Sequence, residues 1–343
     1  MKLITESEVV ELIKKTFPDI DDVPATMSFT QSGLLTSLDI VTLIFEIETE
    51  FDVHFDLEEL DLKLFDSPIM IADTVNNMKG AASLTLRILF DEICSKDVSQ
   101  PAVTFDDVTV NYSDLMERVH RLAVGFIKEG IKKGTHTVII LDNCMEYILS
   151  YFALFYIGAV PVPINTRWNP AEAVKVIKDS GASYFIAREH SGKLCFSQLR
   201  DILENDGVTI NRVILCDPDE SGRSDFDKIA VDDTDTELEP LSGSDIAMIS
   251  YTSGTTGTPK GVMLRHSDIA KISLYTQQIW TEENDQPFSI APLYSAQGFL
   301  SLLINFATGS RFKMISSFNT NDILREISKK NETIFHTQPT MWT

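Results

Sequence analysis

The chain has 343 residues, of which 43% are apolar and 23% charged, an ordinary globular composition with enough length for about two domains. Its formal net charge of −22 at pH 7 argues against nucleic acids and anionic membranes as partners. A binding site for any polyanion must therefore gather its own hydrogen-bond donors locally.

The first eighty residues form an acidic segment with helical patterning. They carry 17 acidic and 5 basic side chains. Thr5 and Glu8 fit a capping box that opens a first helix. The residues of this helix that are expected to face inward are Val9, Ile13 and Phe17. A second helix is expected to begin at Ser37, and two or three shorter helical segments fit within 56–78. The sequence thus predicts a small all-α bundle over residues 1–78.

The second predicted helix carries two different stripes at 3.6 residues per turn. The stripe expected to pack is Leu38, Val41 and Phe45. The other stripe, roughly 100° away, consists of the carboxylates Asp39, Glu46 and Glu50. These carboxylates form either a solvated face or a docking face for a partner protein.

Ser37 is expected to be the N-cap of this helix, on an exposed corner after Gly33-Leu-Leu-Thr36. An acidic helical segment with such a serine resembles an acyl or peptidyl carrier protein. The resemblance implies that a phosphopantetheinyl transferase attaches 4'-phosphopantetheine to Ser37, and that Asp39, Glu46 and Glu50 form the docking face. Carrier domains usually have aspartate where this chain has Thr36. An ordinary helix-capping serine is the alternative interpretation.

A linker is expected at 79–86, and residues 87–343 alternate between strand and helix patterns. Strands are predicted at 137–141, near 160 and at 184–187, with a helix reaching 156 between the first two. A further helix is expected to start at an Asn169 cap with Pro170 in its first position. Residues 217–240 are expected to be a solvated loop. This alternation predicts an α/β domain with a mainly parallel sheet.

Two uncharged stretches, from Tyr147 to the flanking Arg167 and over 288–310, are long enough to suggest membrane spans. Glycines and prolines divide both into shorter pieces, so no membrane span is predicted. The four cysteines show no Cys-x-x-Cys spacing and the N-terminus is polar, which indicates reduced thiols and a cytoplasmic protein. The six histidines form no cluster with ligand spacing, so no structural metal site is predicted. His266 is expected to cap or pack at a helix start.

Residues 251–261 read Tyr-Thr-Ser-Gly-Thr-Thr-Gly-Thr-Pro-Lys-Gly, a run suited to binding phosphates. The glycines allow close backbone approach, while hydroxyls and a lysine supply donors. The predicted phosphate-binding residues are Thr252, Ser253, Gly254, Thr255, Thr256, Gly257, Thr258 and Lys260. The spacing is not that of a Walker A loop. The loop is expected to lie between a strand at 245–250 and a helix near Ser267; a polar loop without ligand is the alternative.

This run resembles the phosphate loop of the adenylate-forming superfamily, which includes acyl-CoA synthetases and peptide-synthetase adenylation domains. Residues 101–115 and 143–165 resemble further parts of the same family. The resemblance implies that ATP with Mg²⁺ activates a carboxylic acid. Ala291-Pro-Leu-Tyr-Ser-Ala-Gln-Gly298 resembles the family's next core motif, which implies that Tyr294 and Ser295 line an acyl pocket, with Ser295 where many members have histidine. No acidic residue lies within 291–305, which favours a fatty or aryl acid over an α-amino acid.

The two resemblances together imply an enzyme that forms an acyl-adenylate and transfers the acyl group to a phosphopantetheine thiol, with the fused carrier as acceptor. Downstream acyl-accepting enzymes are then possible partners. The alternatives are a carrier loaded by other enzymes, with the ligase part as a scaffold, and an inert fragment. In the family the adenine-binding strand, magnesium and ribose ligands and catalytic lysine follow the position of Thr343. The 343 residues are therefore expected to supply one wall of the adenylation site.

Overall fold

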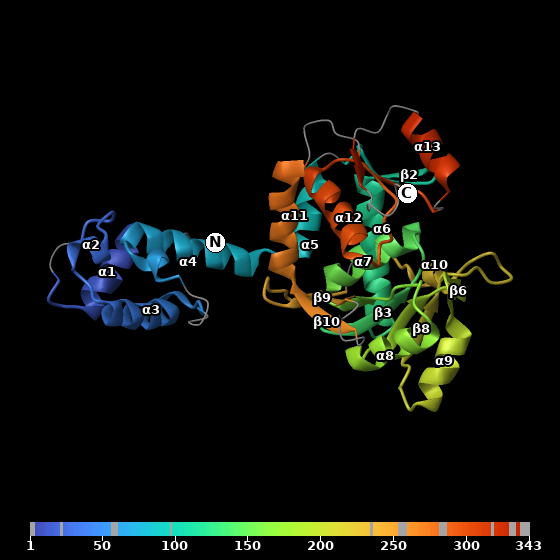
Figure 1. Cartoon of the computed structure of the whole chain (residues 1–343), viewed down its shortest axis with the longest axis horizontal. Helices are drawn as coiled ribbons and strands as arrows, with labels where there is room; N and C mark the ends of the chain where they lie inside the picture. Colours follow the sequence, from blue (N-terminus) through green and yellow to red (C-terminus); the bar gives the residue numbers. More distant parts are fainter. Residues whose placement is uncertain are drawn as a thin grey trace. The chain divides into compact units, whose positions relative to one another are not determined.

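A computed structural model of the chain divides into two units, Met1–Ser83 and Leu84–Thr343 (Figure 1). The structure describes residues 4–20, 23–55, 61–96, 98–233, 236–252, 259–280, 287–316, 319–328 and 334–336. Each unit has a buried apolar core of its own.

Every regular element described in the first unit is helical. These elements are α1 (Glu6–Thr16), α2 (Phe29–Ser32), α3 (Ser37–Phe51), the 3₁₀ turn η1 (Leu62–Phe65) and α4 (Pro68–Ser83). The predicted capping box is confirmed, because Thr5 Oγ1 accepts a hydrogen bond from Glu8 N at 3.3 Å and Glu8 Oε2 accepts one from Thr5 N at 2.8 Å. Val9 and Ile13 of α1 are fully buried, as expected.

The predicted packing stripe of α3 was wrong. Leu38 is 75% exposed and Phe45 is 50% exposed. The residues of α3 that are buried are Ile40, Leu43, Ile44, Ile47 and Phe51. These five positions repeat at three- and four-residue spacing over the whole helix, so burying them removes more apolar area from water than burying the shorter stripe.

Residues 79–86, expected to be a linker, contain the end of α4 and the first residue of α5 (Leu86–Lys96). The helix continues past Gly80 because Ala81 and Ala82 are strong helix formers, and a single glycine opposes the helix by only about 1 kcal/mol.

The second unit contains two sheets and two separate two-stranded hairpins. The sheet β4-β3-β5-β8 is entirely parallel and comprises β3 (His136–Ile140), β4 (Val160–Pro163), β5 (Tyr184–Ala187) and β8 (Arg212–Leu215). The sheet β13-β11-β12-β1-β2 comprises β1 (Pro101–Phe105), β2 (Val108–Asn111), β11 (Pro287–Ser289), β12 (Phe312–Met314) and β13 (Ile334–His336). In it only β1 and β2 pair antiparallel.

Helices cover both faces of the parallel sheet. The remaining helices of this unit are α6 (Tyr112–Lys128), α7 (Met145–Ile157), α8 (Pro170–Ser180), α9 (Phe196–Asn205), α10 (Asp225–Ile229), α11 (His266–Trp280), α12 (Ala296–Thr308) and α13 (Thr320–Ser328). Ile139 of β3 belongs to the core formed with α6 and α7, whereas Val138 and Ile140 belong to the core formed with α8 and α9. Figure 1 shows these helix pairs on opposite sides of the strands. The alternation along β3 produces this layering.

Residues 217–240 are not simply a solvated loop, because they include α10. Ser224 Oγ accepts a hydrogen bond from Asp227 N at 3.0 Å and caps this short helix. Phe226 and Ile229 are buried in the main core. At Gly125 of α6 an added Cβ would lie 2.1 Å from the carbonyl oxygen of Ile229, so this approach requires glycine. The polar composition of the segment concealed the two apolar residues that anchor it.

The two uncharged stretches form α7 with β4 and β11 with α12. Across the described part of the chain, no helix is both long and apolar enough to cross a membrane. All four cysteines are free thiols, and only Cys195 is partly exposed.

His266, the first residue of α11, is fully buried. Its Nδ1 accepts a hydrogen bond from Leu86 N at 3.3 Å, which holds the start of α5 against α11. Burial lowers the pKa of His266 from 6.5 to about 4; Asp245 opposes this shift, while Arg87 and Lys133 reinforce it. The imidazole is therefore neutral in the folded chain at neutral pH.

We expect His266 to make the second unit acid-sensitive. The unfolded chain binds a proton at this residue near pH 6.5, whereas the folded chain does so only near pH 4, so stability falls as pH falls through that window. Between pH 7 and pH 4 the native protein should lose about 3 kcal/mol more than His266→Asn, which keeps an acceptor for Leu86 N. Urea unfolding at both pH values measures this, with exposed His54→Asn as control. An equal pH dependence in the native protein and His266→Asn would contradict the assignment.

Candidate functional site

The predicted phosphate loop connects β9 (Ile246–Thr252) to β10 (Lys260–Arg265), which pair antiparallel. Thr252 and Lys260 lie opposite each other in the register, and both are exposed. The predicted residues Ser253, Gly254, Thr255, Thr256, Gly257 and Thr258 lie outside the described residues. The structure therefore fixes the base of the loop, where one hydroxyl and one ammonium group stand side by side.

The helix expected near Ser267 is present, but the strand that precedes it was not predicted. A six-residue strand, β10, follows the loop, and α11 begins only at His266. Pairing with β9 satisfies backbone hydrogen-bonding groups along one edge of β10. Any phosphate bound at the loop would therefore be held by loop and strand groups rather than by the start of α11.

Tyr251 connects the base of the loop to α8, one of the helices that cover the parallel sheet. Its phenol donates a hydrogen bond of 2.6 Å to Asp179 Oδ2, at the end of α8. Burial raises the pKa of Tyr251, and the bond to Asp179 raises it further. At Gly261, opposite Tyr251, an added Cβ would approach the Tyr251 ring at 3.0 Å. The phenol thus remains a donor and fixes the position at which the loop begins.

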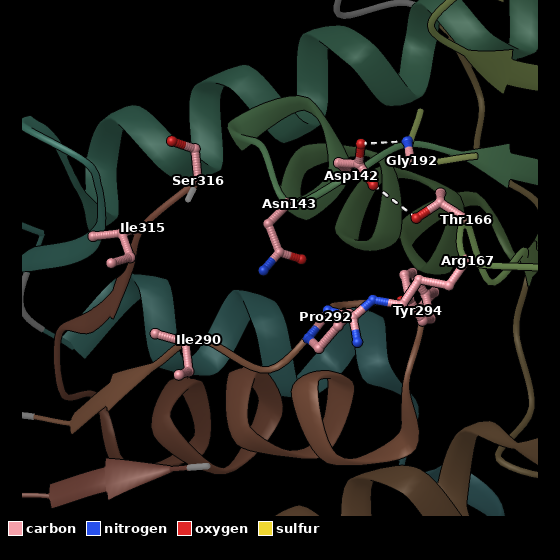
Figure 2. Close-up of a pocket in the computed structure, with 10 residues that line it drawn as sticks. All are labelled: Asp142, Asn143, Thr166, Arg167, Gly192, Ile290, Pro292, Tyr294, Ile315 and Ser316. Atoms are coloured by element: carbon pink, nitrogen blue, oxygen red, sulfur yellow. Dashed lines mark hydrogen bonds between the residues drawn. The ribbon is translucent and has the colours of Figure 1, made fainter. Parts of the chain in front are cut away.

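A cavity of about 190 Å³ lies where strands of both sheets end (Figure 2). The residues that line it are Asp142, Asn143, Thr166, Arg167, Gly192, Ile290, Pro292, Tyr294, Ile315 and Ser316. Asp142 and Asn143 follow β3, Thr166 and Arg167 follow β4, and Ile290 and Ile315 follow β11 and β12. Ligands of open α/β sheets bind at such carboxyl ends. The cavity is therefore the strongest binding-site candidate in the described structure.

Asn143 joins the two sheets at this cavity. Its Nδ2 donates to the carbonyl oxygen of Ala291 at 3.3 Å, and its Oδ1 accepts from Leu293 N at 2.8 Å. Tyr151 of α7 adds a hydrogen bond of 2.9 Å from its phenol to the carbonyl oxygen of Leu293. Figure 2 shows the Asn143 amide at the centre of the cavity. The segment that carries Tyr294 is thereby held at a fixed distance from β3.

Asp142 shapes the opposite wall. Its carboxylate accepts hydrogen bonds from Thr166 Oγ1 and from Gly192 N, each at 2.7 Å. Both bonds are drawn in Figure 2. Because Asp142 is engaged in this way, it serves as a structural clamp between the chain after β4 and the turn that contains Gly192.

Arg167 provides positive charge beside the cavity. Its side chain is exposed, and the hydrogen bond that it makes among the described residues comes from its backbone N–H, to Asn165 Oδ1 at 2.9 Å. Burial raises the pKa of Tyr294, while Arg167 and a hydrogen bond with Thr166 act in the opposite direction. The cavity thus combines a neutral phenol with an exposed cation, a pair suited to an anionic ligand.

The structure brings Tyr294 to the cavity but does not place Ser295 among its lining residues. Ser295 is the N-cap of α12: its Oγ accepts from Gly298 N at 3.1 Å and donates to the carbonyl oxygen of Pro292 at 2.7 Å. At Gly298 an added Cβ would lie 2.2 Å from that same carbonyl oxygen. Ser295 therefore supports the turn that presents Tyr294.

The predicted modification site lies in the first unit. Ser37 is exposed, as expected, but the prediction that it is the N-cap was wrong, because the N-cap of α3 is Thr36. Thr36 Oγ1 accepts from Asp39 N at 3.3 Å and donates to Asp39 Oδ2 at 2.6 Å. Threonine and serine are both good N-caps. Asp39, three residues after Thr36, completes a capping box with Thr36, and this favours Thr36 as the cap.

The three carboxylates predicted as a docking face differ in their surroundings. Asp39 is half-buried and occupied by the capping box, and its bonds with Thr36 lower its pKa. Glu50 is exposed and pairs with Lys15 at 2.9 Å, and Glu46 is exposed. Glu46 and Glu50 thus remain on the surface, whereas Asp39 starts the helix.

Sequence reasoning missed Asp142 and Arg167 as cavity residues and did not assign Asn143 a role. The available signal was their position: each is polar and directly follows a predicted strand. Which polar residues after strands face one another depends on strand order, and that order is a long-range property.

Comparison with known proteins gives consistent matches. A family model described as AMP-binding enzyme matches residues 90–343. A crotonobetaine/carnitine–CoA ligase of Proteus mirabilis is 30% identical over 267 residues, covering 75% of this chain and 51% of that protein. The chain thus spans about half the length of the curated relatives it matches.

Solved structures share the fold. A long-chain-fatty-acid-CoA ligase from Archaeoglobus fulgidus has a TM-score of 0.64 and 23% identity, covering 74% of this chain and 51% of that one. An o-succinylbenzoate CoA synthetase from Bacillus subtilis, in complex with its acyl-adenylate intermediate, has a TM-score of 0.62 and 21% identity, covering 74% and 49%.

Removing the Asn143 amide should loosen the junction between the sheets. Asn143→Ala leaves the Leu293 N–H and the Ala291 carbonyl without this partner, so we expect the free energy of unfolding to fall by about 2 kcal/mol. Chemical denaturation measures the change. Asn205→Ala, at an exposed position, should change stability by less than about 0.5 kcal/mol. Equal effects of the two substitutions would show that Asn143 does not join the sheets energetically.

Proposed function

Because this chain belongs to the AMP-binding enzyme family, we propose that the protein activates a carboxylic acid with ATP and transfers the acyl group to a thiol. In the first step the carboxylate attacks the α-phosphate of ATP, forming acyl-AMP and releasing pyrophosphate. In the second step the thiol sulfur attacks the acyl carbon and AMP leaves. Mg²⁺ enters as part of the ATP substrate and neutralises phosphate charge.

The observation that carries this proposal is the hydroxyl- and glycine-rich loop held at its base by β9 and β10. Lys260 and Thr252 stand together at that base. Groups of this kind stabilise phosphate oxygens most when they are fixed before the charge develops. The Tyr251 bond to Asp179 supplies part of that rigidity. The solved relative from Bacillus subtilis with a bound acyl-adenylate supports the same chemistry.

The acid is proposed to be fatty or aryl rather than an α-amino acid. No acidic residue lies within 291–305 to pair with an α-ammonium group. In the segment that leads into α12, Tyr294 presents a phenol and Pro292 an apolar ring to the cavity. This supports Tyr294 as a pocket residue, with Ser295 acting through the turn that holds it.

We further propose that the accepting thiol is carried on Ser37 of the first unit. The Ser37 hydroxyl is exposed in the first turn of α3. A phosphodiester there would face the positive end of the helix dipole. A 4'-phosphopantetheine arm supplies the thiol, and tethering raises its effective concentration at the adenylate. The exposed residues Leu38, Phe45, Glu46 and Glu50 would then be available to a transferase or ligase partner.

Lys260 should be required for adenylate formation. In acid-dependent exchange of pyrophosphate into ATP, measured with the full-length product of the gene and a panel of fatty and aryl acids, Lys260→Ala should reduce the rate by about tenfold to a hundredfold. Thr255→Ala should reduce it in the same direction. Lys132→Ala, an exposed lysine away from the loop, is the control.

Exchange by Lys260→Ala at the native rate would remove Lys260 from the site. No exchange with any acid tested would move the proposal to a carrier loaded by other enzymes, with the second unit as scaffold.

Modification of Ser37 is tested separately. Incubation with coenzyme A and a broad-specificity phosphopantetheinyl transferase should add the mass of one phosphopantetheine. Ser37→Ala should abolish the addition but leave pyrophosphate exchange intact, and Ser7→Ala on α1 should still be modified. Thr36→Asp should speed the reaction, because carrier domains usually have aspartate before the modified serine and its absence here should slow recognition by the transferase. Unmodified native protein, or a modified Ser37→Ala variant, would contradict the carrier assignment.

A further inference from the structure

A short hairpin between β5 and α9 brings three metal-ligating side chains together. Its strands are β6 (His190–Ser191) and β7 (Leu194–Cys195), and His190 lies opposite Cys195 in the register. Directly opposed residues project from the same face. Glu189 precedes β6, and its Oε1 lies 3.2 Å from Cys195 Sγ. One ligand atom from each of the three residues lies within 4.8 Å of the other two.

We propose that Glu189, His190 and Cys195 form a binding site for Zn²⁺. A thiolate, an imidazole and a carboxylate are the three donor types that zinc takes in proteins, usually in tetrahedral geometry. Hard cations such as Mg²⁺ and Ca²⁺ prefer oxygen ligands alone, so the sulfur and nitrogen argue against them. Three protein ligands leave a fourth position for water. No structural metal site was predicted from the sequence, because the three ligands are brought together by the hairpin and not by a recognisable spacing along the chain.

The residues around the cluster orient the carboxylate. Ser197 Oγ donates a hydrogen bond of 2.5 Å to Glu189 Oε1, and the backbone N–H of Phe196 donates to the Glu189 carbonyl at 2.8 Å. The Ser197 hydrogen bond, followed by that of Cys195, lowers the pKa of Glu189. Such outer partners are a regular feature of metal sites, where they fix the ligand geometry.

The cluster is open to solvent and can be reached by an ion. His190 is exposed, and Glu189 and Cys195 are half-buried. The Cys195 thiol currently donates to Glu189, so zinc binding breaks the S–H bond, forms an S–Zn bond and releases one proton to solvent. A hydrogen-bonded Glu189–Ser197–Cys195 cluster that never takes a metal is the competing outcome.

The same hairpin forms part of the cavity wall. Its turn residue Gly192 donates to Asp142 Oδ2 at 2.7 Å, and Lys193 N donates to the carbonyl oxygen of Thr166 at 2.8 Å. An added Cβ at Gly192 would lie 2.5 Å from that carbonyl. A metal bound at the base of the hairpin would therefore make the hairpin more rigid, since its turn is already fixed to the cavity wall through Gly192.

Cobalt titration of the metal-free protein, kept reduced and anaerobic, tests the proposal. We expect one Co²⁺ per chain, with a thiolate-to-cobalt charge-transfer band in the near ultraviolet and the visible bands of tetrahedral cobalt. Addition of Zn²⁺ should remove both. Cys195→Ser should abolish the charge-transfer band, and His190→Ala should weaken cobalt binding by about tenfold or more.

Two controls separate this site from unspecific binding. His54→Ala removes an exposed histidine of the first unit and should leave the titration unchanged. Zinc should also slow amide hydrogen exchange over residues 189–197 in the native protein but not in Cys195→Ser. A charge-transfer band that survives in Cys195→Ser, or the absence of any such band in the native protein, would overturn the proposal.

Discussion

The side-chain amide of Asn143 is the interaction on which the candidate site depends. It lies just after β3 of the parallel sheet and bonds in both directions to Ala291 and Leu293, which follow β11 of the other sheet. This link adds a direct polar connection to the apolar core that the two sheets share. These two hydrogen bonds hold the segment that leads to Tyr294 next to the end of β3. The phenol of Tyr151 reinforces the same segment from α7.

Fixed hydrogen bonds recur at three other loops of this unit. Asp142 clamps Thr166 and Gly192, Tyr251 ties the phosphate-loop base to Asp179, and Ser295 closes the turn before α12. Each holds a loop at one point. Arg167 is the contrast, an exposed cation beside the cavity that acts on the Tyr294 phenol through its charge. In a chain of net charge −22, such a local cation is what an anionic ligand needs.

Local features of the fold could be predicted from the sequence because their determinants lie within a few residues. The Thr5–Glu8 capping box, the Asn169 cap with Pro170 and the strand at 184–187 are examples. The buried face of α3 could not be assigned from one apolar stripe, because the packing partners that select Ile40 and Leu43 come from other helices. The cavity depends on strand order across two sheets, and β10 was missed because its exposed, mixed composition resembles a loop before a helix.

The capping box of α3 has a consequence for regulation. Thr36 and Asp39 already cap the start of the helix, so the hydroxyl of Ser37 is not needed as the cap. A group attached to Ser37 could therefore be added or removed without dismantling the helix beneath it. The proposed modification would then act on stability mainly through its charge at the start of α3, while the buried core of the bundle stays unchanged.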